Sequence, residues 1–176
     1  MHLTDAEATD PGLTPGSVPA TFEHGEIRFG FAACFDLYFP EHFAALAAQA
    51  VDVVLCTSYQ RSESADRIRG IAQVRALDTG AYPLRGSYAM GQPDTGAHSL
   101  VAAADGAVLN DAGAGACLLA AELDPKRKFT KPVSHGRPEV EHRALIESHR
   151  RAGVYCPRLP FRNRRFARVN RSFRAV

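Results

Sequence analysis

The segment 29–41, FGFAACFDLYFPE, places a cysteine at the end of an apolar run and directly before residues that favour a helix. A turn from a strand into a helix exposes a side chain at the edge of a sheet, and it directs backbone N–H groups, here that of Phe35, at the same point. A helix N-terminus also favours the thiolate. These features suit Cys34 as a nucleophile beside an oxyanion site. The alternative is a core cysteine, since free thiols are commonly buried.

Polar residues near this cysteine have two interpretations each. Asp36 and Glu41 either support the site electrostatically or place favourable negative charge at a helix N-terminus. Ser58 and Tyr59 end the next apolar run, where they either line a pocket or are ordinary loop residues. A pairing of His98 with Cys34, as in a cysteine peptidase, is not supported by the flanking residues, so a strand or loop histidine is expected.

The other cysteines form no CxxC pair, which argues against a zinc ribbon or a thioredoxin-like site. We therefore expect no metal. Cys56 and Cys117 lie in apolar runs and are predicted to be in the core. Free thiols, with no secretory leader visible, favour a cytoplasmic protein.

The elements that would position these residues alternate between strand and helix. Strands are predicted at 27–34 and 51–57, and helices at 41–50 and 62–78, with Ser62 or Ser64 as a cap and Gly80 ending the second helix. Strand-like runs follow at 81–89, 98–104 and 117–123, with a tight turn at 104–107 that suggests a hairpin, and a helix at 140–150. This order predicts an α/β layered fold.

Composition fits one globular domain that does not cross a membrane. The chain has 176 residues, of which 45% are hydrophobic and 23% charged, and its apolar stretches of about ten residues are too short to span a bilayer. The charge is uneven, because residues 1–149 carry 12 basic and 19 acidic side chains, whereas 150–176 carry nine arginines and no acid.

The arginine-rich tail at 156–176 has several interpretations. It could bind nucleic acid or an acidic surface, or it could be a solvated tail or an appendage that packs on an acidic partner. Nucleic-acid binding is not favoured, because no recognised binding fold accompanies the charge.

The run 33–41, ACFDLYFPE, resembles the catalytic cysteine motif of the nitrilase, or carbon-nitrogen hydrolase, superfamily. Further segments at 51–59, 75–78, 96–99, 105–106 and 123–124 follow in that family's order. The resemblance implies an αββα sandwich of the nitrilase type, usually dimerised through its helical layers. It implies that residues 1–155 are the C-terminal portion of a carbon-nitrogen hydrolase domain, followed by the tail at 156–176.

The resemblance also implies the chemistry. Cys34 would attack a small amide or nitrile and form a thioester or thioimidate that water releases, and the Phe35 N–H would contribute to the oxyanion site. Ser87 and Tyr88 fall where family members often have a pocket-lining polar residue. Together with Asp36, Ser58 and Tyr59 they are the predicted substrate-binding residues. No cofactor is implied, and the expected partners are a small-molecule substrate and a second copy of the chain.

Family members also use a glutamate base and a lysine that lie before the cysteine, yet this chain has no lysine before Lys126. We therefore expect a fragment whose N-terminal part is missing. Glu7 lies near the place of a second glutamate found in some members. The alternative is a non-catalytic pseudoenzyme or regulatory binding protein of the same fold. A missing front predicts an exposed sheet edge beside the Cys34 strand, an exposed apolar face and poor solubility.

Overall fold

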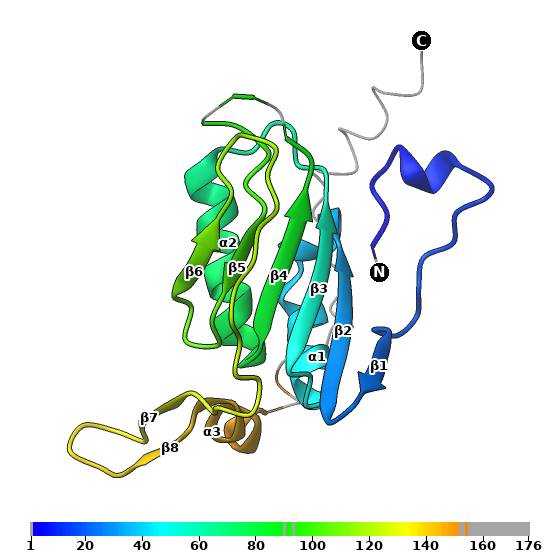
Figure 1. Cartoon of the computed structure of the whole chain (residues 1–176). Helices are drawn as coiled ribbons and strands as arrows, with labels where there is room; N and C mark the ends of the chain where they lie inside the picture. The colour runs from blue at the N-terminus through cyan, green and yellow to red at the C-terminus, as the bar shows by residue number, and fades with distance from the viewer. Residues whose placement is uncertain (1, 90, 93, 152–153, 155–176) are drawn as a thin grey trace.

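The structure, a computed structural model, describes residues 2–89, 91–92, 94–151 and 154. Its centre is a six-stranded sheet in the order β1-β2-β3-β4-β5-β6 (Figure 1). These strands are β1 (Thr21–His24), β2 (Ile27–Ala33), β3 (Val53–Ser58), β4 (Tyr82–Ser87), β5 (Leu100–Ala102) and β6 (Val108–Asp111). A separate two-stranded ribbon joins β7 (Thr130–Pro132) and β8 (Glu139–Glu141).

Two helices, α1 (Pro40–Ala48) and α2 (Ala65–Thr79), cover one face of the large sheet (Figure 1). A third helix, α3 (His142–His149), lies beside the β7–β8 ribbon, and 3-10 turns form at η1 (Glu7–Thr9) and η2 (Cys34–Tyr38). Within the described residues, no helix is long and apolar enough to cross a membrane.

The centre of the sheet is parallel. β2 pairs with β3 and β3 with β4 in parallel register, and α1 and α2 make the two connections, whereas β1, β5 and β6 join as antiparallel strands. This arrangement confirms the predicted α/β layering. Because parallel strands end at the same edge, the loops after β2, β3 and β4 meet there.

The close packing of β2 on α1 depends on a glycine. A Cβ on Gly30 would lie 2.7 Å from Leu46 Cδ2 and 3.2 Å from the Val51 methyl carbons. Leu46 and Val51 are completely buried and belong to the core between the sheet and the helices. A side chain at position 30 would therefore push β2 and α1 apart.

The predicted helix ends are confirmed for α2. The Ser64 hydroxyl accepts a hydrogen bond from Arg67 N, so Ser64 rather than Ser62 is the cap. Gly80 ends the helix in the left-handed region at φ 61°, which is the conformation that favours glycine.

The prediction of a strand at 117–123 is wrong, and so is the prediction of a buried Cys117, which is exposed. The hairpin at 104–107 is confirmed, since Ala103 N donates to Ala107 O at 2.8 Å. Its second strand, however, is β6, which starts immediately after the turn and pairs with β5. The physical reason is composition: residues 117–123 include two alanines and a glutamate, which have low β propensity, and no β-branched or aromatic residue.

The expected open edge beside the Cys34 strand is present in part. β1 pairs with β2 from Ile27 to Gly30, and Phe31 N donates to Ala20 O, whereas Ala32 and Ala33 have no strand partner on this side in the described sheet. The expected apolar exposure is present on the two strands, where Phe22 and Phe31 are 42% and 43% exposed. Solubility stays a prediction. The arginine-rich tail at 156–176 and Cys156 lie outside the described residues.

Candidate active site

Cys34 lies where β2 ends and η2 begins, with a half-buried side chain. Its φ of 36° is in the left-handed region, which is sparsely populated by residues other than glycine. Strain of this kind persists only where surrounding contacts impose it, and it concentrates at functional sites. The backbone N–H of Tyr59, on the loop after β3, lies 3.5 Å from Cys34 Sγ and donates to it.

Asp36 holds the turn that carries Cys34. Its side chain is fully buried, and Oδ2 accepts a hydrogen bond from Ala33 N at 2.9 Å. The other oxygen accepts from His2 N at 2.6 Å and contacts His2 Nδ1 at 2.9 Å. Burial raises the pKa of Asp36, but the hydrogen bonds from Ala33 and His2 together lower it by more, so the net pKa is below its ordinary value.

The loop after β3 is organised by a buried amide. Gln60 is 7% exposed. Its Oε1 accepts from Ser58 Oγ at 2.8 Å, and its Nε2 donates to Tyr38 Oη at 3.1 Å. The Tyr38 hydroxyl in turn donates to Glu63 Oε1 at 2.5 Å, and this bond is the main reason that the pKa of Glu63 is lowered. Gln60 thus ties the β3 loop to η2.

Arg85 lies beneath this loop, on β4, and is 2% exposed. Its guanidinium donates to the carbonyls of Ala97 and His98 at 2.6 and 2.7 Å, to Gln60 Oε1 at 3.2–3.4 Å, and to Ser58 Oγ at 3.2 Å. Burial lowers the pKa of Arg85. Sequence analysis missed this residue, although an arginine inside an apolar strand run, YPLRGS, was a visible signal.

The predicted residues Ser87 and Tyr88 lie at the end of β4, next to the β3 loop. Ser87 pairs with Ser58 in the strand register. Its backbone exchanges hydrogen bonds with Ser99 Oγ, while its own buried Oγ has no partner among the described residues. The ring of Tyr88 lies 4.1 Å from that of Tyr59. Burial, followed by the interaction with Tyr59, raises the pKa of Tyr88 to about 12.

Glu7 has a different environment. It is exposed in η1, and its Oε2 accepts from Thr4 N at 2.7 Å and from Thr4 Oγ1 at 2.8 Å. These two bonds lower the pKa of Glu7, which makes its carboxylate a weaker base. The structure thus brings Cys34, the β3 loop and the β4 end together at one sheet edge, and it places Glu7 on a separate exposed turn.

The remaining candidates have structural surroundings. Cys56 is buried, as predicted, and burial raises its pKa to about 12. His98 precedes β5, is 3% exposed, and contacts Asp111 Oδ1 through Nδ1 at 3.0 Å. Glu41 is exposed in the first turn of α1. No cluster of three or more metal-ligating side chains occurs in the part of the chain that the structure describes.

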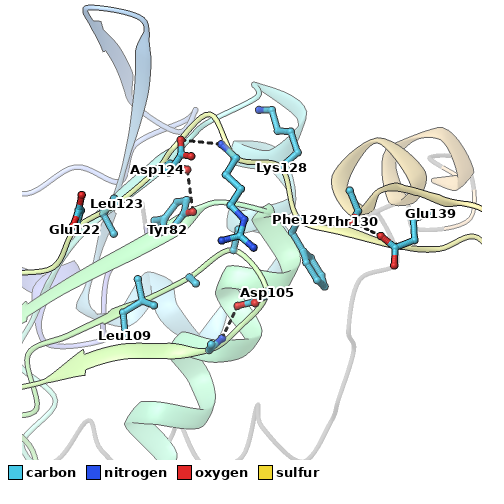
Figure 2. Close-up of a pocket in the computed structure, with 14 residues that line it drawn as sticks. Tyr82, Asp105, Leu109, Glu122, Leu123, Asp124, Lys128, Phe129, Thr130 and Glu139 are labelled. Carbon is cyan, nitrogen blue, oxygen red and sulfur yellow. Dashed lines mark hydrogen bonds between the residues drawn. The ribbon is translucent and has the colours of Figure 1, made fainter.

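A large hollow lies away from the predicted site residues. A cavity of about 690 Å³ lies near the start of β4 and the β5–β6 turn, and Figure 2 shows its lining. Tyr82 Oη donates to Asp124 O at 3.0 Å there, and the predicted site residues do not line it. A second hollow of about 630 Å³, between the N-terminal segment and α1, is lined in part by Phe35.

Comparison with known proteins identifies relatives of this chain. The family model described as carbon-nitrogen hydrolase matches residues 2–128. Proteins named deaminated glutathione amidase from two strains of Synechocystis are each 27% identical over 123 residues, which is 68% of this chain and 44% of theirs. The chain therefore spans less than half the length of these curated relatives.

Solved structures show the same fold. A mutant of an amidase from Nesterenkonia, of the nitrilase superfamily, matches with a TM-score of 0.51 at 20% identity, over 58% of this chain and 40% of that one. Nit3 of Saccharomyces cerevisiae, also of the nitrilase superfamily, matches with a TM-score of 0.50 at 25% identity, over the same shares. The sheet and its helical layer thus have the nitrilase-type α/β arrangement that the sequence predicts.

Proposed function

Because the chain belongs to the carbon-nitrogen hydrolase family, we propose that it carries the nucleophile of an enzyme that hydrolyses a small amide. The observation that carries the proposal is the strained turn at Cys34, whose half-buried thiol accepts the Tyr59 N–H at an edge where three parallel strands end. An amide is favoured over a nitrile because the Synechocystis relatives and the Nesterenkonia protein are named amidases.

In the proposed reaction, Cys34 Sγ bonds to the amide carbon and the carbonyl oxygen becomes an anion. The Phe35 N–H, in the first turn of η2 where N–H groups lack partners within the helix, binds that anion. The C–N bond then breaks, and the amine leaves with a proton, so a thioester remains. Water adds to the thioester, the S–C bond breaks, and the carboxylic acid is released while a proton returns to Cys34.

The other predicted residues take supporting roles in this proposal. Ser58, Tyr59, Ser87 and Tyr88 form the polar border of the substrate site, since they lie on the neighbouring strand ends. Asp36 positions the Cys34 turn and does not contact substrate, because its carboxylate is buried and accepts bonds from within the chain.

The base and the lysine of the family triad come, in this proposal, from residues outside the 176. Glu7 receives no role as the base, since its exposed carboxylate is bonded to Thr4. A domain at 1–155, a separate tail at 156–176, homodimerisation and cytoplasmic location remain predictions.

Competitive alkylation tests the nucleophile. The chain is treated with substoichiometric iodoacetamide at pH 7, and peptide mapping by mass spectrometry gives the modification rate at each cysteine. Cys117 is the internal reference, because it is exposed and an ordinary exposed thiol is only a few per cent thiolate at this pH. We expect Cys34 to react about tenfold faster than Cys117 although it is less exposed, since an activated thiol reacts through its larger thiolate fraction.

The variant C34S controls for the assignment of the modified peptide, and it should leave the rate at Cys117 unchanged. If Cys117 or another cysteine reacts before Cys34, the nucleophile proposal is wrong and the non-catalytic alternative is favoured.

A further inference from the structure

Within the described residues, a buried positive charge without a carboxylate hydrogen-bond partner lies against the loop that reaches the candidate nucleophile. Arg85 is 2% exposed, and among the described residues its hydrogen-bond acceptors are two carbonyls, one amide and one hydroxyl. A buried ion without a counter-charge is costly, so proteins usually pair one or neutralise it. The arrangement at Arg85 therefore favours a nearby anion, and the described residues place no carboxylate within hydrogen-bond distance of its guanidinium.

The acid that acts on Arg85 electrostatically is already engaged. Asp111 raises the pKa of Arg85, after the two cysteines in order of effect. Its Oδ2 accepts from Arg69 Nε at 2.6 Å, and its Oδ1 accepts from Gly113 N at 2.8 Å and contacts His98 Nδ1 at 3.0 Å. Asp111 thus balances Arg69 first, and the charge of Arg85 acts on the thiols of Cys56 and Cys34, the groups that influence it most.

Of these two thiols, Cys34 is the one at the sheet edge where the proposed reaction takes place. Cys56 is buried, and burial raises its pKa to about 12 in spite of the opposing effect of Arg85. Cys34 is half-buried and also receives the Tyr59 N–H at 3.5 Å.

The hydrogen bonds of Arg85 also hold the loop that reaches the thiol. Its Nη2 binds Ser58 Oγ and Gln60 Oε1, on either side of Tyr59, and its Nη1 binds the carbonyls of Ala97 and His98 before β5. The planar guanidinium is suited to this because it offers five donors in a fixed geometry. One side chain on β4 therefore fixes the Tyr59 N–H and provides the charge.

We propose that Arg85 is a positioning residue for the Cys34 nucleophile, which holds the Tyr59 N–H against the thiol and stabilises the thiolate with its buried charge. This inference rests on the proposed role of Cys34 in amide hydrolysis. It adds a cation from within this chain to the lysine that the family resemblance implies.

The test is the pH dependence of alkylation at Cys34, with iodoacetamide as the probe and peptide mapping as the readout. In R85M the pH at which the rate reaches half of its plateau should rise by about one unit, which lowers the rate at pH 7 about tenfold. R85K keeps the charge but not the fixed donor geometry, so its pH profile should lie between those of R85M and the unmodified chain. Far-ultraviolet circular dichroism establishes that each variant is folded, and the rate at exposed Cys117 should stay constant.

A second comparison leaves the donors of Arg85 in place and adds a negative charge next to its guanidinium. Q60E is isosteric and places a carboxylate against the guanidinium, but it gives up the Nε2 donor to Tyr38 Oη. The double variant Q60E/Y38F is therefore compared with Y38F, and it should show the same upward movement of the pH profile. If R85M does not fold, this comparison tests whether the charge of Arg85 affects the pH profile of alkylation at Cys34.

Each outcome has a defined meaning. An unchanged pH profile at Cys34 in folded R85M, or in Q60E/Y38F relative to Y38F, overturns the inference. A profile that moves equally in R85M and R85K also overturns it, because charge is then not the cause. Failure of Cys34 to react ahead of Cys117 in the unmodified chain refutes the proposed function itself, so the two failures are distinguishable.

Discussion

The buried carboxylate of Asp36 supports a quantitative prediction about the Cys34 turn. In D36N the amide keeps the size of the carboxylate but only one oxygen. If the NH₂ replaces Oδ2 it faces Ala33 N–H, and if it replaces Oδ1 it faces His2 N–H. Either orientation leaves at least one buried donor unpaired, which costs about 1–3 kcal/mol. The charge assistance of the remaining bonds is also lost, so we expect a total destabilisation of about 2–4 kcal/mol at pH 7.

The pH dependence follows from the direction of the shift. The folded-state pKa of Asp36 is lowered, so the carboxylate contributes stability above its unfolded value of about 3.9, and this contribution is lost as the pH falls through the folded value. The difference between the unmodified chain and D36N should therefore be constant near pH 6–7 and shrink below about pH 4.

Urea unfolding followed by circular dichroism at pH 7 and at pH 3.5 measures both effects. E41Q is the matched control, because Glu41 is an exposed carboxylate in the same segment and its loss should cost no more than about 0.3–1 kcal/mol. A D36N chain within 0.5 kcal/mol of the unmodified one at pH 7, a threshold of about the size of ordinary surface effects, would refute the reasoning. So would a difference that does not shrink at pH 3.5.

Other substitutions test the packing. G30A should lower the free energy of unfolding, measured with urea, by about 1–3 kcal/mol, since its Cβ would contact buried Leu46; G86A, with nothing within 4 Å of a new Cβ, is the control and should lower it far less. S64A should destabilise α2 by about 1 kcal/mol through loss of its cap, and an unchanged melting temperature would contradict this. Cys56, whose pKa is raised to about 12, should stay unmodified by iodoacetamide at pH 9 and react only in denaturant; labelling in the native chain would show that it is not enclosed.

The sequence by itself determined the local features of this protein. The apolar runs and their caps predicted β2, α1, β3 and α2, because burial periodicity and end signals act within a few residues. The motif around Cys34 predicted that this residue lies at a strand end, and it predicted the family to which the chain belongs. The strand prediction for 117–123 is wrong because the run is apolar on average but contains alanine and glutamate, which have low β propensity. The sequence does not predict β6, which is only four residues long.

Only the tertiary structure decided what surrounds the thiol. Asp36 had two interpretations from the sequence, and the fold brings His2 to its buried carboxylate from 34 residues away. Arg85 is 51 positions from Cys34 in sequence, and its role arises from parallel strand ends that converge at one edge. Such roles depend on burial and on long-range partners, which a linear spacing does not encode.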